Sequence, residues 1–143
     1  MSAVVKAARS WLGTPYRHQA SCRGAGCDCL GLIRGVWRDC FGDEPEATPP
    51  YSMDWSEPSG RELLWDAAGR HLQIQPISHV APGDVLLFRM RSGAVAKHLG
   101  IQAKTGPLPT FIHAYSGHGV VESSLSSPWA RRIVARFRFP ERI

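Results

Sequence analysis

The chain has 143 residues, of which 43% are hydrophobic and 20% are charged, and its formal net charge is +5 at pH 7. This length suits one domain with a single core, and the ordinary composition excludes a disordered or fibrous chain. No apolar run approaches the roughly 20 residues of a membrane-spanning helix, and four cysteines are too few for a disulfide framework. The positive charge suggests an anionic partner, for which nucleic acid, a cell-wall polymer and an acidic protein surface all qualify.

The first third of the chain is predicted to be helix, loop and helix. Residues 3–12 carry an apolar face at helical spacing, and Ser2 is suited to cap this helix. A loop rich in Gly, Ser, Arg and Cys follows over residues 14–26. The clearest periodicity of the chain runs from Cys29 to Phe41, where apolar residues recur at helical spacing in one continuous stripe.

Residues 43–76 are predicted to be a surface insertion that ends in a helix. Proline and acidic residues are frequent over residues 43–58, which indicates an irregular excursion. The helix is expected at residues 59–72, where Ser59 and Glu62 have the spacing of a capping box.

Beyond the insertion, the sequence changes to short apolar segments separated by Gly and Pro. Strands are expected at residues 84–88, 98–103, 110–115, 119–123 and 132–139. Helices first and strands afterwards indicate an α+β domain, with the N-terminal helices packed on a C-terminal antiparallel sheet. No repeat or linker divides the chain, so a single domain over residues 1–143 is expected.

Cys29 is the first candidate for chemistry, because Asp28 is suited to cap the second helix and so places Cys29 in its first turn. The thiolate is the nucleophilic form of cysteine, and the N–H groups at a helix N-terminus lower the thiol pKa and can bind an oxyanion. Two other interpretations stay open here. Cys29 can be a core residue of the apolar stripe, or a zinc ligand with Cys22, Cys27 and His18, although this spacing departs from the usual zinc-ligand pairs.

A cysteine nucleophile needs a base, and two of the six histidines lie on predicted strands. Antiparallel pairing of these strands would make His98 and His113 cross-strand neighbours, with Cβ atoms about 4.5–5.5 Å apart. One imidazole could then take the thiol proton while the other orients it. Gly100, on the same strand face as His98, is expected to leave room for the helix end that carries Cys29. The alternative is two unrelated strand histidines.

These segments together resemble the NlpC/P60 family of cysteine peptidases, which have a papain-like fold. The resemblance covers most of the chain and rests on five motifs in the order of the family, namely WLGTPYR, DCLGLI, PGDVLLF, KHLGIQ and FIHA. It implies that Cys29 is the nucleophile, that His98 is the base and that His113 orients the base. It also implies that the reaction needs neither a metal nor a cofactor.

Members of this family hydrolyse amide bonds in the stem peptides of peptidoglycan, often between D-glutamate and diaminopimelate. The resemblance therefore implies stem peptides as the substrate, and it places Tyr16, Asp28 and Leu30 where they contact the substrate or the oxyanion. Many bacterial members have a serine directly after the nucleophile, which helps to bind the free amine end of the substrate. Leu30 occupies that position here, so the resemblance leaves open which bond is cut.

Exported members of the family usually carry a leader and wall-binding modules, whereas this sequence reaches its first catalytic motif almost at once and has no apolar segment of signal-peptide length. This arrangement, the form GCDCLGL and the segment PPYSMDW are similar to tail-associated peptidases of phages and gene transfer agents. The resemblance implies an enzyme that is made in the cytoplasm without a signal peptide and bound to hub or baseplate proteins of a tail. It would act in the periplasm or cell wall of the target cell.

Three other functions stay open. A catalytically silent docking protein of a tail is the main alternative, and a basic edge for a neighbour could be formed by Arg131, Arg132, Arg136, Arg138 and Arg142. The same arginines also fit a solvated, half-exposed edge strand. An acyltransferase would have a similar site with another acceptor for the thioester. Specific nucleic-acid binding has only the net charge in its favour, since no pattern of basic and stacking aromatic residues is present.

Overall fold

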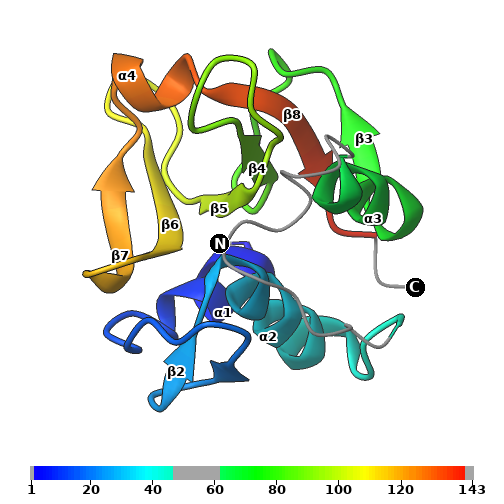
Figure 1. Ribbon diagram of the computed structural model, residues 1–143, viewed down its shortest axis with the longest axis vertical. Helices are drawn as coiled ribbons and strands as arrows, with labels where there is room; N and C mark the ends of the chain where they lie inside the picture. Colours follow the sequence, from blue (N-terminus) through cyan, green and yellow to red (C-terminus); the bar gives the residue numbers. More distant parts are fainter. Residues whose placement is uncertain (1, 47–61, 141–143) are drawn as a thin grey trace.

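Figure 1 shows the computed structural model of the protein, which describes residues 2–46 and 62–140. The helices are α1 (Ala3–Arg9), α2 (Cys29–Phe41), α3 (Leu63–His71) and α4 (Ser127–Ala130). The strands are β1 (Ser21–Cys22), β2 (Gly26–Cys27), β3 (Gln73–Gln75), β4 (Val85–Phe88), β5 (His98–Gln102), β6 (Thr110–Tyr115), β7 (Gly119–Ser124) and β8 (Ile133–Arg138).

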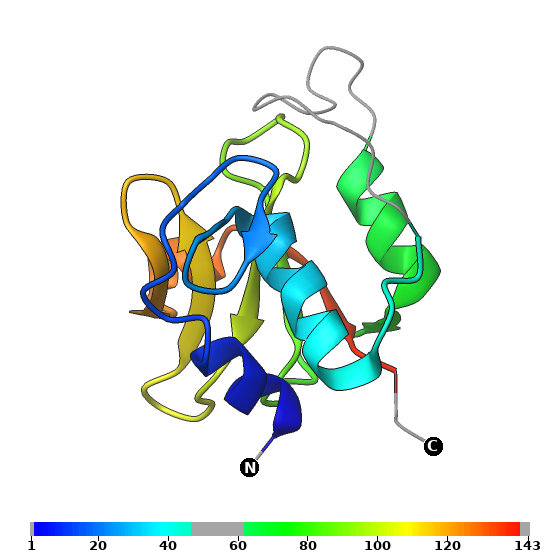
Figure 2. The same ribbon diagram turned by 90° about the horizontal axis from the view of Figure 1, so that it is seen from below.

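Most of the strands belong to one six-stranded sheet with the order β3-β8-β4-β5-β6-β7, in which every neighbouring pair is antiparallel. Helices α1 and α2 pack on one face of this sheet, and α4 packs on the other. Figure 2 shows α3 beside α2 on the same side of the molecule. Strands β1 and β2 pair with each other next to α2. Helices packed on an antiparallel sheet confirm the predicted α+β class.

Both faces of the large sheet are buried, because successive residues of a strand point to opposite sides. The face toward α1 and α2 contributes to the main core with Val85, Leu87, Leu99, Ile101, Ile112 and Phe137. The opposite face carries Leu86, Phe88 and Phe111, which pack with Trp129 of α4. A two-sided sheet of this kind can hold polar catalytic groups on one face while the other face anchors the helices.

Helix α2 has the predicted bounds, and its apolar stripe is buried against the sheet through Leu32, Ile33, Val36 and Cys40. Asp28 caps it as expected, because its Oδ1 accepts the N–H of Gly31 at 2.7 Å. Gly35 permits a close approach of Trp11, which follows α1, since a Cβ atom at this position would lie 2.0 Å from the Trp11 ring. The cap and the stripe together fix the direction in which the N-terminus of α2 points.

Helix α1 is capped as predicted, since the Ser2 Oγ accepts the N–H of Val5 at 3.2 Å. The helix ends at Arg9 and not at residue 12. The reason is a tighter turn, in which the N–H of Trp11 bonds to the carbonyl of Ala8, three residues earlier, at 3.0 Å.

Helix α3 begins later than predicted, because Glu62 is its N-cap residue and not its third residue. The predicted capping box is therefore wrong. The Glu62 carboxylate instead accepts the N–H of Ala96 at 2.8 Å and pairs with Arg89 at 3.0 Å. Ser59 and the PPYSMDW segment lie outside the described residues. The last part of the predicted insertion is not a separate excursion, since β3 joins the edge of the large sheet.

Strand β8 corrects the expectation of a solvated, half-exposed basic edge. It is an interior strand, flanked by β3 and β4, and Arg136 is only 2% exposed. Its guanidinium donates to the buried carboxylate of Asp84 at 3.0 Å and to the side-chain oxygen of Gln102 at 3.2 Å. Arg138 reaches the same carboxylate at 2.8 Å. A buried carboxylate needs such partners, so these two arginines serve the interior; Arg142 lies outside the described residues.

Four short elements were not predicted, namely β1, β2, β3 and α4. Each has only two to four residues, which is too short for a periodic pattern to develop. Among the helices within residues 2–46 and 62–140, none combines the length and the apolar character that a membrane crossing requires.

Candidate active site

Cys29 is the first residue of α2, and its thiol lies beside the start of β5. It is half-buried, and its sulfur donates to the carbonyl of Lys97 at 3.6 Å. The backbone N–H of Leu99 also hydrogen-bonds to this sulfur. Lys97 and Leu99 flank His98, the first residue of β5. The fold therefore brings the predicted nucleophile to the backbone on both sides of the predicted base.

Burial, and not the helix terminus, dominates the acidity of this thiol. Removal from water and the nearby charge of Asp28 raise the pKa of Cys29 to about 12, whereas hydrogen bonds from the backbone of Leu99, Leu30 and Cys29 act in the opposite direction. The predicted net lowering of this pKa is wrong. An uncharged thiol is the resting form at neutral pH, so the sulfur needs a base to become nucleophilic.

At the start of α2, two backbone N–H groups are not used by the helix cap or by the preceding loop, and both bond to the Cys29 thiol. The N–H of Asp28 donates to the carbonyl of Ala20 at 3.3 Å, and the N–H of Gly31 is held by the cap. The N–H groups of Cys29 and Leu30 lie between them, and both hydrogen-bond to the Cys29 sulfur. Donors at a helix N-terminus that no backbone carbonyl or capping oxygen engages can stabilise a thiolate, or an oxyanion that forms beside it.

The two strand histidines form a direct pair. The Nε2 of His98 lies 2.8 Å from the Nδ1 of His113, and both side chains are buried. The other ring nitrogen of His98, Nδ1, takes no part in this hydrogen bond. This arrangement leaves Nδ1 available to accept a proton, while Nε2 is committed to His113.

The pairing register differs in detail from the prediction. Strand β5 pairs with β6 through Ile101 opposite Ile112, and a continuation of this register places Gly100 opposite His113. His98 and His113 are therefore diagonal neighbours, which are farther apart than directly opposed residues but within reach of long side chains. A Cβ atom on Gly100 would lie 2.8 Å from the ring of Phe111 and 3.4 Å from the Cβ of His113. Gly100 thus leaves room for these side chains, and not for the helix end as expected.

Both imidazoles are uncharged at neutral pH. Burial and the neighbouring His113 lower the pKa of His98 to about 3. Burial and the charge of His118 lower the pKa of His113 to about 4. A neutral imidazole can accept a proton, so the burial of His98 keeps it in the form that a base requires.

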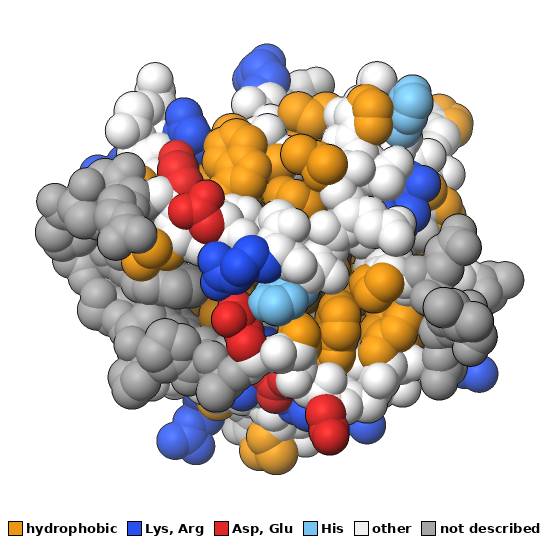
Figure 3. Space-filling view, turned by 90° about the vertical axis from the view of Figure 1, so that its right-hand side faces the viewer, with side chains coloured by type: hydrophobic (Ala, Val, Ile, Leu, Met, Phe, Trp, Pro, Cys, Tyr) orange, Lys and Arg blue, Asp and Glu red, His pale blue; other side chains and the backbone are white. Residues whose placement is uncertain are grey.

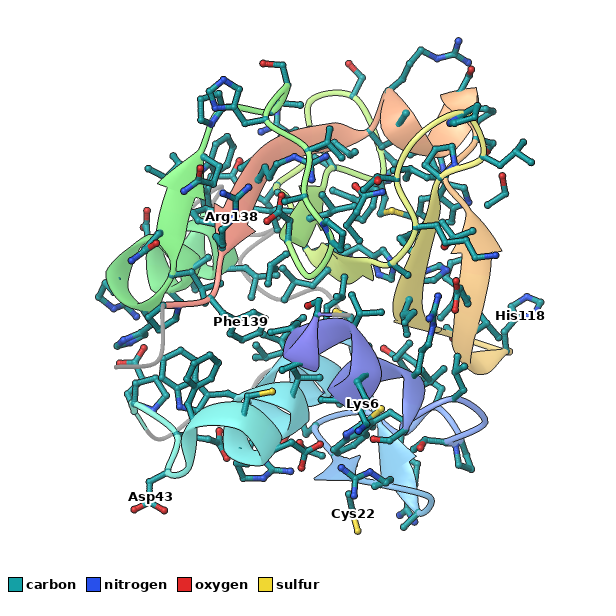
Figure 4. The ribbon with its side chains drawn as sticks, turned by 180° about the vertical axis from the view of Figure 1, so that it is seen from behind. Lys6, Cys22, Asp43, His118, Arg138 and Phe139 are labelled. Carbon is teal, nitrogen blue, oxygen red and sulfur yellow. The ribbon has the colours of Figure 1, made fainter. Side chains whose placement is uncertain are left out.

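Aromatic rings enclose the histidine pair. The ring of Trp129 lies with its centroid 5.7 Å from that of His98 and 5.1 Å from that of His113. On the other side, Tyr115 stacks on His113 at 5.4 Å and also on His118 at 5.2 Å. Figure 4 shows His118 at the turn between β6 and β7, at the edge of the molecule. This packing explains the burial that lowers both histidine pKa values.

Tyr16, which the family resemblance implies as a contact of the substrate or the oxyanion, lies close to the Cys29 thiol. An isolated bridge pairs its backbone with that of Cys27, two residues before the nucleophile. Burial and the charges of Cys29 and Asp28 raise the pKa of the Tyr16 hydroxyl to about 12. The hydroxyl is therefore protonated at neutral pH, and it can donate a hydrogen bond near the thiol.

Asp28 and Leu30, the two neighbours of Cys29, have different environments. The Asp28 carboxylate is buried, and its oxygens accept the N–H groups of Gly31 and Gln19 at 2.7 Å each. Leu30 lines a cavity of about 400 Å³ between α2 and α3, together with Leu99. Figure 3 views the molecule from the side of α3 and β3, where basic, acidic and histidine side chains lie between two groups of hydrophobic ones.

The other cysteines do not join Cys29 in a metal site. Cys22 is exposed and points away from the body of the molecule (Figure 4), whereas Cys27 is fully buried. In the part of the chain that the structure describes, no three His, Cys, Asp or Glu side chains are grouped so as to hold a metal ion.

Two residues near the histidine pair were not predicted from the sequence. Trp129 belongs to α4, which is too short to be recognised, and Ser123 lies on β7 with its Oγ 2.9 Å from the Nε2 of His113. The only available signal was that Ser123 belongs to the predicted strand after that of His113. The pairing register that brings the two together was not predictable from composition.

Known proteins resemble this chain over most of its length. It is 32% identical over 120 residues to the probable endopeptidase NlpC of Escherichia coli (strain K12), an alignment that covers 83% of this chain and 64% of that protein. It is 29% identical over 133 residues to the murein DD-endopeptidase MepS/murein LD-carboxypeptidase of the same strain, with 88% and 59% covered. The chain therefore spans about 60% of the length of these curated relatives.

A solved structure has the same fold. The crystal structure of the NlpC/p60 domain of the peptidoglycan hydrolase SagA matches with a TM-score of 0.65 at 23% sequence identity, and the match covers 96% of this chain and 97% of that domain. A model of the NlpC/P60 family matches residues 13–138, a range that contains the cysteine, both strand histidines and Tyr16. The chain belongs to the NlpC/P60 family.

Proposed function

We propose that the chain is a cysteine peptidase that hydrolyses an amide bond in the stem peptides of peptidoglycan, with Cys29 as the nucleophile, His98 as the base and His113 as the group that orients the base. The observation that carries this proposal is the position of the thiol. Its sulfur meets the backbone on both sides of His98, and the Nε2 of that histidine is already bonded to His113.

The pKa directions define how the first step proceeds. The Cys29 thiol and the His98 imidazole are both uncharged at rest, so the thiol proton passes to Nδ1 of His98 as the sulfur attacks the scissile carbonyl. His98 then gives this proton to the leaving amine, which departs and leaves a thioester on Cys29. Water hydrolyses the thioester while His98 again acts as the base.

The oxyanion of the tetrahedral intermediate would be bound at the start of α2. The N–H groups of Cys29 and Leu30 are the two donors that the cap leaves free, and the Tyr16 hydroxyl is protonated and close by. Donors that are already in place stabilise a developing negative charge without rearrangement. The buried Asp28 carboxylate supports this site by holding the helix cap and the preceding loop.

The substrate class is supported by the relatives, whose names describe a murein DD-endopeptidase and LD-carboxypeptidase in one case and a probable endopeptidase in the other. These names cover more than one kind of bond. Leu30 presents methyl groups where a hydroxyl would bind a free amine, so we expect the bond choice to differ from that of serine-containing members. Residues 1–143 are taken to act as one catalytic domain, in line with the single core that joins the helices to the sheet.

Digestion of purified peptidoglycan tests this function. The wild-type protein should release muropeptides with new amine and carboxyl ends, which mass spectrometry identifies together with the bond that was cut. Cys29→Ala should abolish release, and His98→Ala should slow it by about 10²–10⁴-fold. Cys22→Ala is the matched control, because Cys22 is exposed and distant from the pair. Digestion by Cys29→Ala at the wild-type rate would refute the assignment, and new cross-links in place of free ends would indicate acyl transfer.

A location in a phage-like tail is the second part of the proposal, with hub or baseplate proteins as neighbours and the cell wall of the target cell as the place of action. It is supported by the likeness of the GCDCLGL motif to the tail-associated peptidases. Proteomic analysis of purified tail particles from the source organism would test it. Absence of the chain from such particles, with the protein present in the cells, would contradict this location while leaving the peptidase assignment intact.

A further inference from the structure

The histidine pair continues to a third side chain. The Nε2 of His98 lies 2.8 Å from the Nδ1 of His113, and the Nε2 of His113 lies 2.9 Å from the Oγ of Ser123. Both nitrogens of the His113 ring are therefore bonded. His113 is almost completely buried, so a change of protonation at one of its nitrogens must be matched at the other.

Only one arrangement of protons along this chain is compatible with a base at Nδ1 of His98. If Nδ1 accepts the thiol proton, Nε2 of His98 carries a hydrogen and donates it to Nδ1 of His113. His113 then carries its own hydrogen on Nε2, and that hydrogen needs an acceptor. The Ser123 hydroxyl oxygen is this acceptor. In the reverse arrangement, the Ser123 hydroxyl donates to Nε2 of His113, and Nδ1 of His113 donates to Nε2 of His98. The hydrogen of His98 then lies on Nδ1, which can no longer accept the thiol proton.

Ring packing holds His113 in place without help from Ser123. The Phe111 ring lies with its centroid 4.1 Å from that of His113, and Tyr115 stacks on His113 at 5.4 Å. Ser123 is opposite Phe111 in the β6–β7 register, so it reaches the edge of the His113 ring and not its face. A hydrogen bond at the edge of a ring that is already packed on its faces controls the position of the proton more than the position of the ring.

We propose that Ser123 is a positioning residue of the catalytic site, which accepts a hydrogen bond from Nε2 of His113 and thereby sets the tautomers of His113 and His98. This inference rests on the proposed function for its effect on activity. Its effect on the protons does not depend on that function, because it follows from the hydrogen bonds alone.

Two variants of equal shape test the role of the hydroxyl. Ser123→Thr keeps a hydroxyl, whereas Ser123→Val replaces it by a methyl group of similar volume. Relative to Ser123→Thr, Ser123→Val should lower kcat for peptidoglycan digestion by about fivefold, the effect of one neutral hydrogen bond. KM should not change, because the proposed role of Ser123 acts through His113 and not through the substrate. Ser124→Val is the matched control on the next, exposed residue and should retain wild-type kcat. Equal kcat for the Thr and Val variants would overturn the proposal.

The tautomers are measured by ¹⁵N–¹H correlation spectra of the imidazoles at pH 7. In the wild-type protein, His98 and His113 should both carry hydrogen on Nε2, and Ser123→Val should increase the fraction with hydrogen on Nδ1. A wild-type His98 with its hydrogen on Nδ1, or spectra that are identical in the Thr and Val variants, would overturn the proposal. These spectra need no active enzyme. A protein with the expected tautomers but no peptidase activity would therefore contradict the proposed function alone.

Discussion

Replacement of Asp28 by asparagine should make the protein less stable and the Cys29 thiol more reactive at the same time. The Asp28 carboxylate accepts two backbone N–H groups, that of Gly31 at Oδ1 and that of Gln19 at Oδ2, both at 2.7 Å. Asparagine has a single carbonyl oxygen, so Asp28→Asn can satisfy one of these donors. Its amide nitrogen then faces the other.

The size of the stability change follows from this geometry. A hydrogen bond to a charged group contributes about 1.5–3 kcal/mol, and a carboxylate at a helix N-terminus contributes about 0.3–1 kcal/mol more. Because Asp28 is buried, water cannot replace the lost acceptor. We therefore expect Asp28→Asn to lower the free energy of unfolding by about 2–4 kcal/mol. Urea denaturation followed by tryptophan fluorescence measures this change.

The thiol should respond in the opposite sense. The charge of Asp28 is one of the two causes that raise the pKa of Cys29, so its removal lowers this pKa and increases the thiolate fraction at any given pH. Alkylation of Cys29 by iodoacetamide, followed by mass spectrometry from pH 7 to pH 10, should be faster in Asp28→Asn than in the wild type. Burial remains, so the pKa should stay above that of a free cysteine.

Asp43→Asn is the matched control, because Asp43 is exposed and points away from the molecule near the end of α2 (Figure 4). It should change neither stability nor alkylation. Unchanged stability of Asp28→Asn would show that the two hydrogen bonds contribute little. Slower alkylation would show that the charge at position 28 is not what disfavours the thiolate.

Further predictions concern pH, packing and the buried ion pair. Burial lowers the pKa of His98 to about 3 and that of His113 to about 4, so the rate of digestion should not fall when the pH is lowered through 6.5. The same histidines bind protons near pH 6.5 in the unfolded chain but not in the folded one. The free energy of unfolding should therefore fall as the pH drops from 6.5 toward 4. Gly35→Ala should lower the free energy of unfolding by about 1–3 kcal/mol through the contact with Trp11. Arg136→Met should lower it by about 3 kcal/mol, because it removes a buried partner of a buried carboxylate.

Matched variants check these three predictions. A rate that halves near pH 6.5 would contradict the lowered pKa of His98. Gly69→Ala should not destabilise α3, because a Cβ atom there meets nothing within 4 Å, and equal effects of Gly35→Ala and Gly69→Ala would exclude the packing argument. Arg131→Met is the control for Arg136→Met, because it replaces an exposed arginine. If both variants unfold at the same urea concentration, the buried ion pair does not contribute to the stability of the fold.

Much of the fold follows from periodicity in the sequence. The stripe from Cys29 to Phe41 predicts α2 with its observed bounds, because thirteen residues show several helical turns. The strands after residue 84 are recognisable from short apolar runs between turns. The short elements are not, since β3 has three residues and α4 has four. Without β3, the sequence predicts an exposed edge at β8, and the burial of Arg136 cannot be anticipated.

The site is predictable in its members but not in its electrostatics. The helix start and the alternation along two strands single out Cys29, His98 and His113 as candidates, and the fold brings the Cys29 sulfur to the backbone beside His98 and pairs His98 with His113. The sign of the thiol pKa shift depends on how deeply the sulfur is buried, which is a tertiary property. The contact of Ser123 with His113 depends on the register of β6 against β7. A shift of one residue in this register would turn the Ser123 side chain to the other face of the sheet.

The contact of the Cys29 sulfur with Lys97 and Leu99 joins parts of the chain that are made at different times. When a ribosome has completed α2, the segment that carries the two imidazoles has not yet been synthesised. The thiol at that stage lacks its proposed proton acceptor and the strand whose backbone it contacts. The growing chain therefore cannot hold the complete candidate site, which forms only when the later strands close the sheet over the helix.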